Sequence, residues 1–139
     1  MRLPFVLIAS GALAACAASH PIEPQLASPS VTFGSAEVMR VELANFDFSP
    51  REIRLHAGQP YELQLANIAS GAHDFAAPEF FAAAQVKPED ATLVAGGEVE
   101  VAGMTTSAVH LVPAAGEYKL VCTHTGHALL GMTGRIVVE

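Results

Sequence analysis

The segment VCTHTGHALLGMTG, residues 121–134, holds the residues of this chain that best suit metal chemistry. Cys122, His127 and Met132 follow one another at the spacing Cys-x4-His-x4-Met. A thiolate, an imidazole and a thioether are three of the four ligands of a blue copper site, in which two histidines and one cysteine surround the metal and a methionine binds weakly on the axis. Sulfur ligands favour Cu(I) and imidazoles accommodate Cu(II), so such a site suits both oxidation states.

The second imidazole must come from another part of the chain, and we expect it to be His73 in the segment NIASGAHDFAAP. His73 follows a predicted strand that ends at Asn67 and a turn that contains Gly71. It lies far from Cys122 in the sequence, but a β-sandwich brings such connections together at one end.

Each candidate ligand also has an ordinary structural explanation. Cys122 could be a buried strand residue, Met132 could fill the core, and His73 could cap or bridge a turn. A cysteine beside a histidine could also be a nucleophile with its base, but a methionine has no part in that chemistry. The combination of all four residue types favours the metal site.

Short alternating runs from residue 36 onward predict the elements that position these residues. Runs such as VMRVELANF, YELQLAN and SAVHLVP alternate apolar and polar residues, and Gly or Pro separates them. Seven or eight such strands at a spacing of about 8–12 residues predict an all-β fold, a β-sandwich. One Ala-rich stretch that begins near Pro78 breaks the pattern, so we expect a short helical or irregular insertion near 77–86.

The first 35 residues predict export and anchoring. Residues 1–15 have one basic residue, an apolar run and then small residues, which is typical of a signal peptide. The stretch that ends in Cys16 resembles the lipobox of bacterial lipoproteins, in which the cysteine is lipidated. Residues 16–35 are rich in Pro, Ser and Ala, which predicts a flexible tether to a single domain over residues 36–139.

The charge and the cysteine count of the chain limit the classes of function that it could have. Fourteen acidic against seven basic residues give a net charge of −7, and no basic run occurs, which argues against a nucleic acid partner. The chain has two cysteines, so a lipidated Cys16 would leave Cys122 without a partner in an oxidising compartment.

Two long segments carry a family resemblance. GEYKLVCTHTGHALLGMTGRIVV looks like the carboxy-terminal copper loop of the cupredoxins, the superfamily of plastocyanin, azurin and rusticyanin, and FDFSPREIRLHAGQPYELQLANIASGAHDF resembles the segment with their first histidine. The resemblance implies a Greek-key sandwich with one type 1 copper ion. Its implied ligands are His73, Cys122, His127 and Met132.

The resemblance also bears on the residues around the site. It assigns the ligand role to His127 rather than His124, whose own role stays open between a solvent-facing neighbour and a supporting residue. Asp74 stands where the family often has Asn, and with Thr123 we expect it to support the copper loop. The resemblance further implies that Ala128, Leu129 and Leu130 form an apolar patch for docking to partner proteins.

The function expected on this basis is one-electron transfer, without enzymatic activity, by a monomer anchored in a bacterial cell envelope and facing the periplasm. Its partners would be redox proteins of the cytochrome or terminal oxidase and reductase class. The alternative is a periplasmic copper-binding protein for copper tolerance or delivery. Met-rich or His-rich tails would favour that alternative, and this chain has none.

Overall fold

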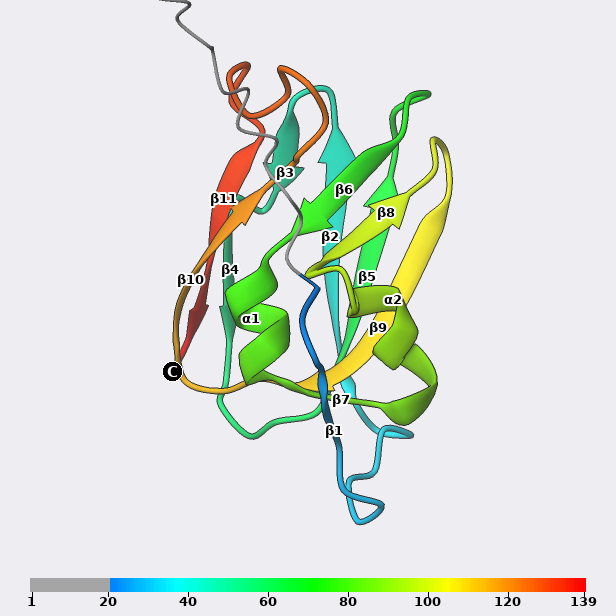
Figure 1. Cartoon of the computed structure of the whole chain (residues 1–139), viewed down its shortest axis with the longest axis vertical. Coiled ribbons are helices and arrows are strands. Elements are labelled where there is room, and N and C mark those ends of the chain that lie inside the picture. Colours follow the sequence, from blue (N-terminus) through cyan, green and yellow to red (C-terminus); the bar gives the residue numbers. More distant parts are fainter. Residues whose placement is uncertain (1–20) are drawn as a thin grey trace, which may run out of the picture.

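A computed structural model describes residues 21–139, which form two β-sheets packed face to face (Figure 1). The first sheet has the strand order β1-β7-β9-β5-β2-β3. Its strands are β1 (Gln25–Leu26), β7 (Gln85–Val86), β9 (Thr106–Val112), β5 (Tyr61–Asn67), β2 (Glu37–Ala44) and β3 (Asp47–Ser49). The predicted signal peptide and Cys16 lie outside the described residues.

The second sheet has the order β4-β11-β10-β6-β8. Its strands are β4 (Glu52–Leu55), β11 (Thr133–Val138), β10 (Gly116–Val121), β6 (His73–Ala76) and β8 (Glu98–Val101). β10 and β11 are consecutive in the sequence, whereas β4 pairs in parallel with β11 and β6 pairs antiparallel with β10 from distant parts of the chain. The predicted cupredoxin-like β-sandwich is confirmed, although short edge strands raise the strand number above the seven or eight expected.

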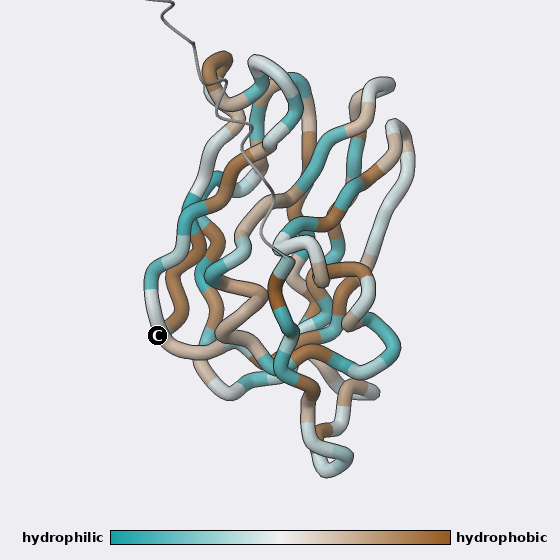
Figure 2. Tube along the Cα trace, in the orientation of Figure 1, coloured by the Kyte–Doolittle hydropathy of each residue, from teal (hydrophilic) through white to brown (hydrophobic). Residues whose placement is uncertain are grey.

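Side chains alternate between the core and the solvent along most strands, and this alternation forms the sandwich. In β4, Ile53 and Leu55 are buried while Arg54 is exposed. Figure 2 shows the same alternation as brown and teal along the chain. Burying aliphatic side chains of this kind contributes about 1.5–3 kcal/mol each. The largest fully buried aromatic side chains are Tyr61, Phe48, Phe75, Phe80 and Phe81.

The insertion predicted near 77–86 contains α1 (Pro78–Ala83), with proline in its first turn as expected. Strand β7 follows it directly. The 3₁₀ helix η1 (Pro88–Asp90) and the short helix α2 (Ala91–Val94) come next. None of the helices in the described part of the chain is long and apolar enough to cross a membrane.

Part of the expected tether packs on the domain. Within residues 21–35, β1 pairs in parallel with β7, Ala27 is buried, and the Ile22 amide donates to the Ala95 carbonyl over 2.9 Å. For this part the prediction of a free tether is wrong. Its sequence has no strand periodicity, but backbone hydrogen bonds can add a strand to a sheet edge without one.

Candidate metal centre

Strand pairing explains how His73 and Cys122 meet. His73 is the first residue of β6, and Cys122 directly follows β10. The two strands run antiparallel, with Val121 opposite Ala76. The last residue of β10 therefore lies beside the last residue of β6, and the chain that continues from β10 into Cys122 runs back along β6 toward His73. Both side chains are fully buried there.

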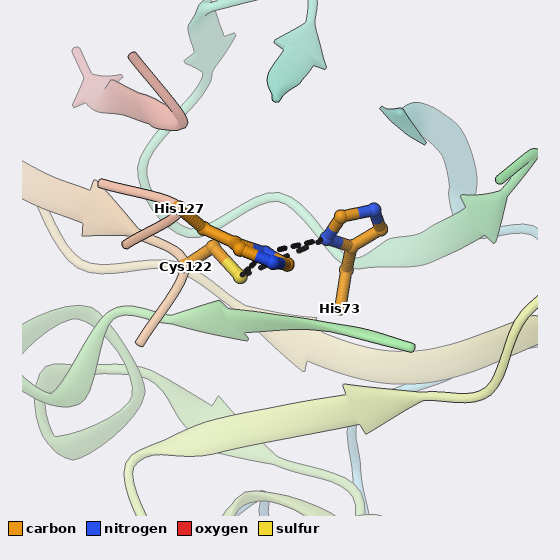
Figure 3. A group of neighbouring side chains, drawn as sticks. All are labelled: His73, Cys122 and His127. Atoms are coloured by element: carbon orange, nitrogen blue, oxygen red, sulfur yellow. Dashed lines mark hydrogen bonds between the residues drawn. The ribbon is translucent and has the colours of Figure 1, made fainter. Parts of the chain in front are cut away.

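Three of the predicted ligand side chains point toward one another (Figure 3). The two Nδ1 atoms of His73 and His127 are 3.1 Å apart. The Sγ atom of Cys122 lies 3.3 Å from Nδ1 of His127 and 3.8 Å from Nδ1 of His73. Two imidazole nitrogens and one sulfur thus form a small triangle.

This triangle fits a bound metal ion. Nitrogen and sulfur ligands bind a divalent ion at about 2.0–2.3 Å, so three of them in one plane are about 3.5–4 Å apart. The observed edges need only a few tenths of an ångström of widening. The donor set of two imidazoles and one thiolate is the trigonal set of a blue copper site.

Met132, the fourth predicted ligand, lies at the same corner of the molecule. It is fully buried, its carbonyl accepts the amide of Cys122 at 3.1 Å, and its own amide donates to the carbonyl of His127 at 3.0 Å. These two bonds close the loop from Cys122 to Met132. A thioether in this place is available as a weak axial ligand.

The loop between β10 and β11 forms a compact turn over residues 126–131. Gly126 has φ +82, a conformation that other residues adopt only with strain. His127 is half-buried, whereas Leu129 is 94% exposed and Leu130 64%. The tip of this orange-red loop is brown in Figure 2, so its most exposed part is apolar.

Burial changes the proton affinities of two ligand groups. Desolvation raises the pKa of the Cys122 thiol. Desolvation, followed by the nearby charges of His127 and His124, lowers the pKa of His73. The metal-free site therefore favours neutral groups, and binding a metal requires the thiol to release its proton.

Asp74 and Thr123, which were expected to support the copper loop together, contact each other at the start of this loop. Oδ1 of the buried Asp74 accepts the backbone amide of Thr123 at 2.7 Å, and Oδ2 accepts its hydroxyl group. Because Thr123 is the residue after Cys122, this pair ties β6 to the loop beside two predicted ligands.

Sequence reasoning missed three residues that surround the site. Asn45, in the turn between β2 and β3, faces Nε2 of His73 through its Oδ1 at 2.9 Å. The ring of Phe46 meets His127 edge-on with centroids 4.9 Å apart. Glu100 of β8 lies 3.0 Å from Nε2 of His124. The polar turn residue Asn45 carries the only sequence signal, and that signal is weak.

His110, which is not among the predicted ligands, makes its contacts away from the metal centre. Its Nδ1 lies 2.8 Å from Oδ2 of Asp90, and Nε2 lies 3.7 Å from Glu62. These contacts join η1 to the sheet and do not involve the metal centre.

A sequence profile of copper-binding proteins of the plastocyanin/azurin family matches residues 36–139. The chain belongs to this family. Copper is therefore the cofactor of this cupredoxin, and the matched range includes all four predicted ligands.

Solved structures share the fold. Auracyanin A, a blue copper protein from Chloroflexus aurantiacus, is 23% identical with a TM-score of 0.55, and the match covers 76% of this chain and 100% of that one. Dithionite-reduced auracyanin from Roseiflexus castenholzii is 15% identical with a TM-score of 0.56, covering 76% and 99%. These likenesses support the cupredoxin fold.

The same fold also occurs inside a larger enzyme. The multicopper oxidase McoA from Aquifex aeolicus is 17% identical with a TM-score of 0.58, and the match covers 78% of this cupredoxin but 30% of the oxidase. A comparison with curated protein sequences gives no significant match.

Proposed function

We propose that this cupredoxin is a type 1 blue copper protein that carries single electrons between redox proteins. The observation that supports this most directly is the triangle of His73 Nδ1, Cys122 Sγ and His127 Nδ1, with edges of 3.1–3.8 Å. A copper ion held there would accept and release one electron by alternating between Cu(II) and Cu(I).

Each residue has a separate task in this proposal. Cys122 supplies the thiolate, His73 and His127 supply the two equatorial nitrogens, and Met132 supplies the weak axial sulfur. The buried ligands His73 and Cys122 are anchored to the ends of β6 and β10, and they exclude water from the site. Ligands that are fixed before binding move little when the charge of the site changes.

The same rigidity favours electron transfer over copper delivery. A delivery protein must expose its ligands to an acceptor, whereas His73 and Cys122 are both 0% exposed. A carrier needs only one ligand close to the surface, and the half-buried His127 has that position.

Docking would occur through the apolar loop. Ala128, Leu129 and Leu130 follow His127 directly, and the two leucines are largely exposed. We propose that this patch contacts redox partners of the cytochrome or terminal oxidase and reductase class, with the protein acting as a monomer. An electron would then leave through the imidazole of His127.

The visible absorption spectrum tests the site. The Cu(II) form should show an intense thiolate-to-copper charge-transfer band, which Cys122→Ser removes. Thr125→Ala is the matched control, because Thr125 is an exposed residue of the same loop. A colourless Cu(II) complex of the wild-type protein would refute the blue copper assignment.

We also propose that lipidated Cys16 anchors the protein in the bacterial cell envelope, facing the periplasm. The support is the small-residue stretch before Cys16 and the signal-like residues 1–15. Mass spectrometry should find a lipidated mature N-terminus, and Cys16→Ala should release or misprocess the protein. An unmodified mature chain that begins at another residue would contradict the proposal.

A further inference from the structure

His124, which belongs to the copper loop, is fastened to a strand at the edge of the second sheet. Its Nε2 atom lies 3.1 Å from Oε1 and 3.0 Å from Oε2 of Glu100. Glu100 is in β8, directly opposite Asp74 of β6. Because one ring nitrogen contacts both oxygens of a single carboxylate, the imidazole is held in both position and orientation.

The ring of His124 also stacks on the ring of His127. Their centroids are 5.3 Å apart and the planes differ by 25°. The amide of His127 donates to the carbonyl of His124 over 3.0 Å, which fixes the two residues relative to each other. Phe46 contributes an edge-on contact to His127 from the turn between β2 and β3.

His127 needs such support more than the other ligands do. His73 and Cys122 are fully buried at strand ends, whereas His127 is half-buried in a loop that contains Gly126. A ring that rotates freely must be ordered when it binds a metal, and that ordering weakens binding. Outer contacts that orient a ligand ring reduce this loss.

The hydrogen bonds argue against a second metal site at the same place. Asp74, Glu100 and His124 offer ligand atoms within 4.8 Å of one another. Both oxygens of Asp74, however, accept hydrogen bonds from Thr123, and both oxygens of Glu100 face His124. The three side chains are already paired, as expected for groups that brace a loop.

We propose that His124 is a positioning residue for His127. Glu100 holds the imidazole of His124, and the stacked rings keep Nδ1 of His127 directed at Sγ of Cys122. This inference rests on the proposed ligand role of His127. It assigns His124 to metal retention and loop order rather than to coordination.

Five variants test the proposal. His124→Ala removes the stacked ring, and His124→Phe keeps a ring without the bond to Glu100. Glu100→Ala removes the anchor, and Glu100→Gln keeps an oxygen acceptor. Glu98→Ala is the matched control, since Glu98 is a carboxylate two residues away in the same strand. The Glu100 side chain is 55% exposed, so its truncation should spare the fold.

Two measurements separate positioning from coordination. In the copper-loaded protein, His124→Ala and Glu100→Ala should keep the visible band but lose copper to excess chelator roughly tenfold faster. Glu100→Gln and Glu98→Ala should lose it at the wild-type rate, and His124→Phe at an intermediate one. In the metal-free protein, NMR relaxation of the His127 ring should show increased motion in His124→Ala and Glu100→Ala.

Several outcomes would overturn the inference. If His124→Ala and Glu100→Ala lose copper at the wild-type rate and leave the motion of the His127 ring unchanged, the contacts do not position His127. Equal effects of Glu98→Ala and Glu100→Ala would indicate a general charge effect. Loss of the band in His124→Ala would make His124 a ligand. A wild-type protein without the band would instead refute the proposed function itself.

Discussion

The Nε2 atom of His73 lies 2.9 Å from Oδ1 of Asn45. Because a carbonyl oxygen only accepts, this contact assigns the proton to Nε2 and leaves the lone pair on Nδ1. That lone pair faces Cys122 and His127. A ligand needs this tautomer, with the proton on Nε2 and Nδ1 free to bind the metal. Asn45 thus prepares His73 for metal binding before any metal is present.

Replacing Asn45 should therefore weaken copper binding. Asn45→Leu has a similar shape but no acceptor, and we expect copper affinity to fall by roughly 10- to 100-fold in a chelator competition. Asn45→Asp keeps an oxygen acceptor and should retain wild-type affinity within a few fold. Nitrogen NMR of the metal-free Leu variant should show a mixture of His73 tautomers. Equal affinity in the Leu variant and the wild type would exclude this role.

The charge of Asp74 should lower the reduction potential. Asp74→Asn can keep both hydrogen bonds to Thr123, because its oxygen accepts the amide and its NH₂ donates to the hydroxyl group. Removing one negative charge near the site destabilises Cu(II) by about 1–2 kcal/mol, which for one electron is about 40–90 mV. Voltammetry should show a rise of this size, with the visible band retained. A lower potential would contradict the prediction.

Glu98 should make stability depend on pH. Desolvation, then the charges of Asp74 and Glu100, raises the pKa of Glu98 above its ordinary value. The folded state thus binds the Glu98 proton more tightly than the unfolded state does. The stability contributed by protonated Glu98 is fully present below the unfolded pKa of about 4.5 and is lost as pH rises through the folded pKa. Ionised Glu98 therefore costs stability at neutral pH.

Urea unfolding of the metal-free Glu98→Gln variant measures this cost. At pH 7 we expect it to be more stable than the wild type by less than about 1 kcal/mol, because solvent screens a half-buried group. Near pH 4 the gain should disappear. The exposed Glu117 provides the control variant Glu117→Gln. A gain that is the same at both pH values would show that ionisation is not its cause.

Local patterns made much of the fold and the ligand set predictable. Alternation predicted the sandwich, and Cys122, His127 and Met132 are close enough in sequence to form a recognisable spacing. Asn45, Phe46 and Glu100 reach the site only because distant strands pair, so no local pattern marks them beyond the weak signal of a polar turn residue at Asn45. The position of β1 depends on backbone bonds to β7, which side-chain patterns do not encode.

The axial assignment of Met132 gives the last prediction. Met132 is fully buried, and its amide bonds to His127. Met132→Leu preserves the side-chain volume, so its cost in unfolding free energy should stay below about 1.5 kcal/mol. Loss of the weak sulfur donor disfavours Cu(II), so the visible band should persist while the potential rises. Met132→Gln offers an oxygen that stabilises Cu(II), so its potential should fall. If voltammetry shows no shift, or shifts in the same direction, for the two variants, Met132 is a core residue and not the axial ligand.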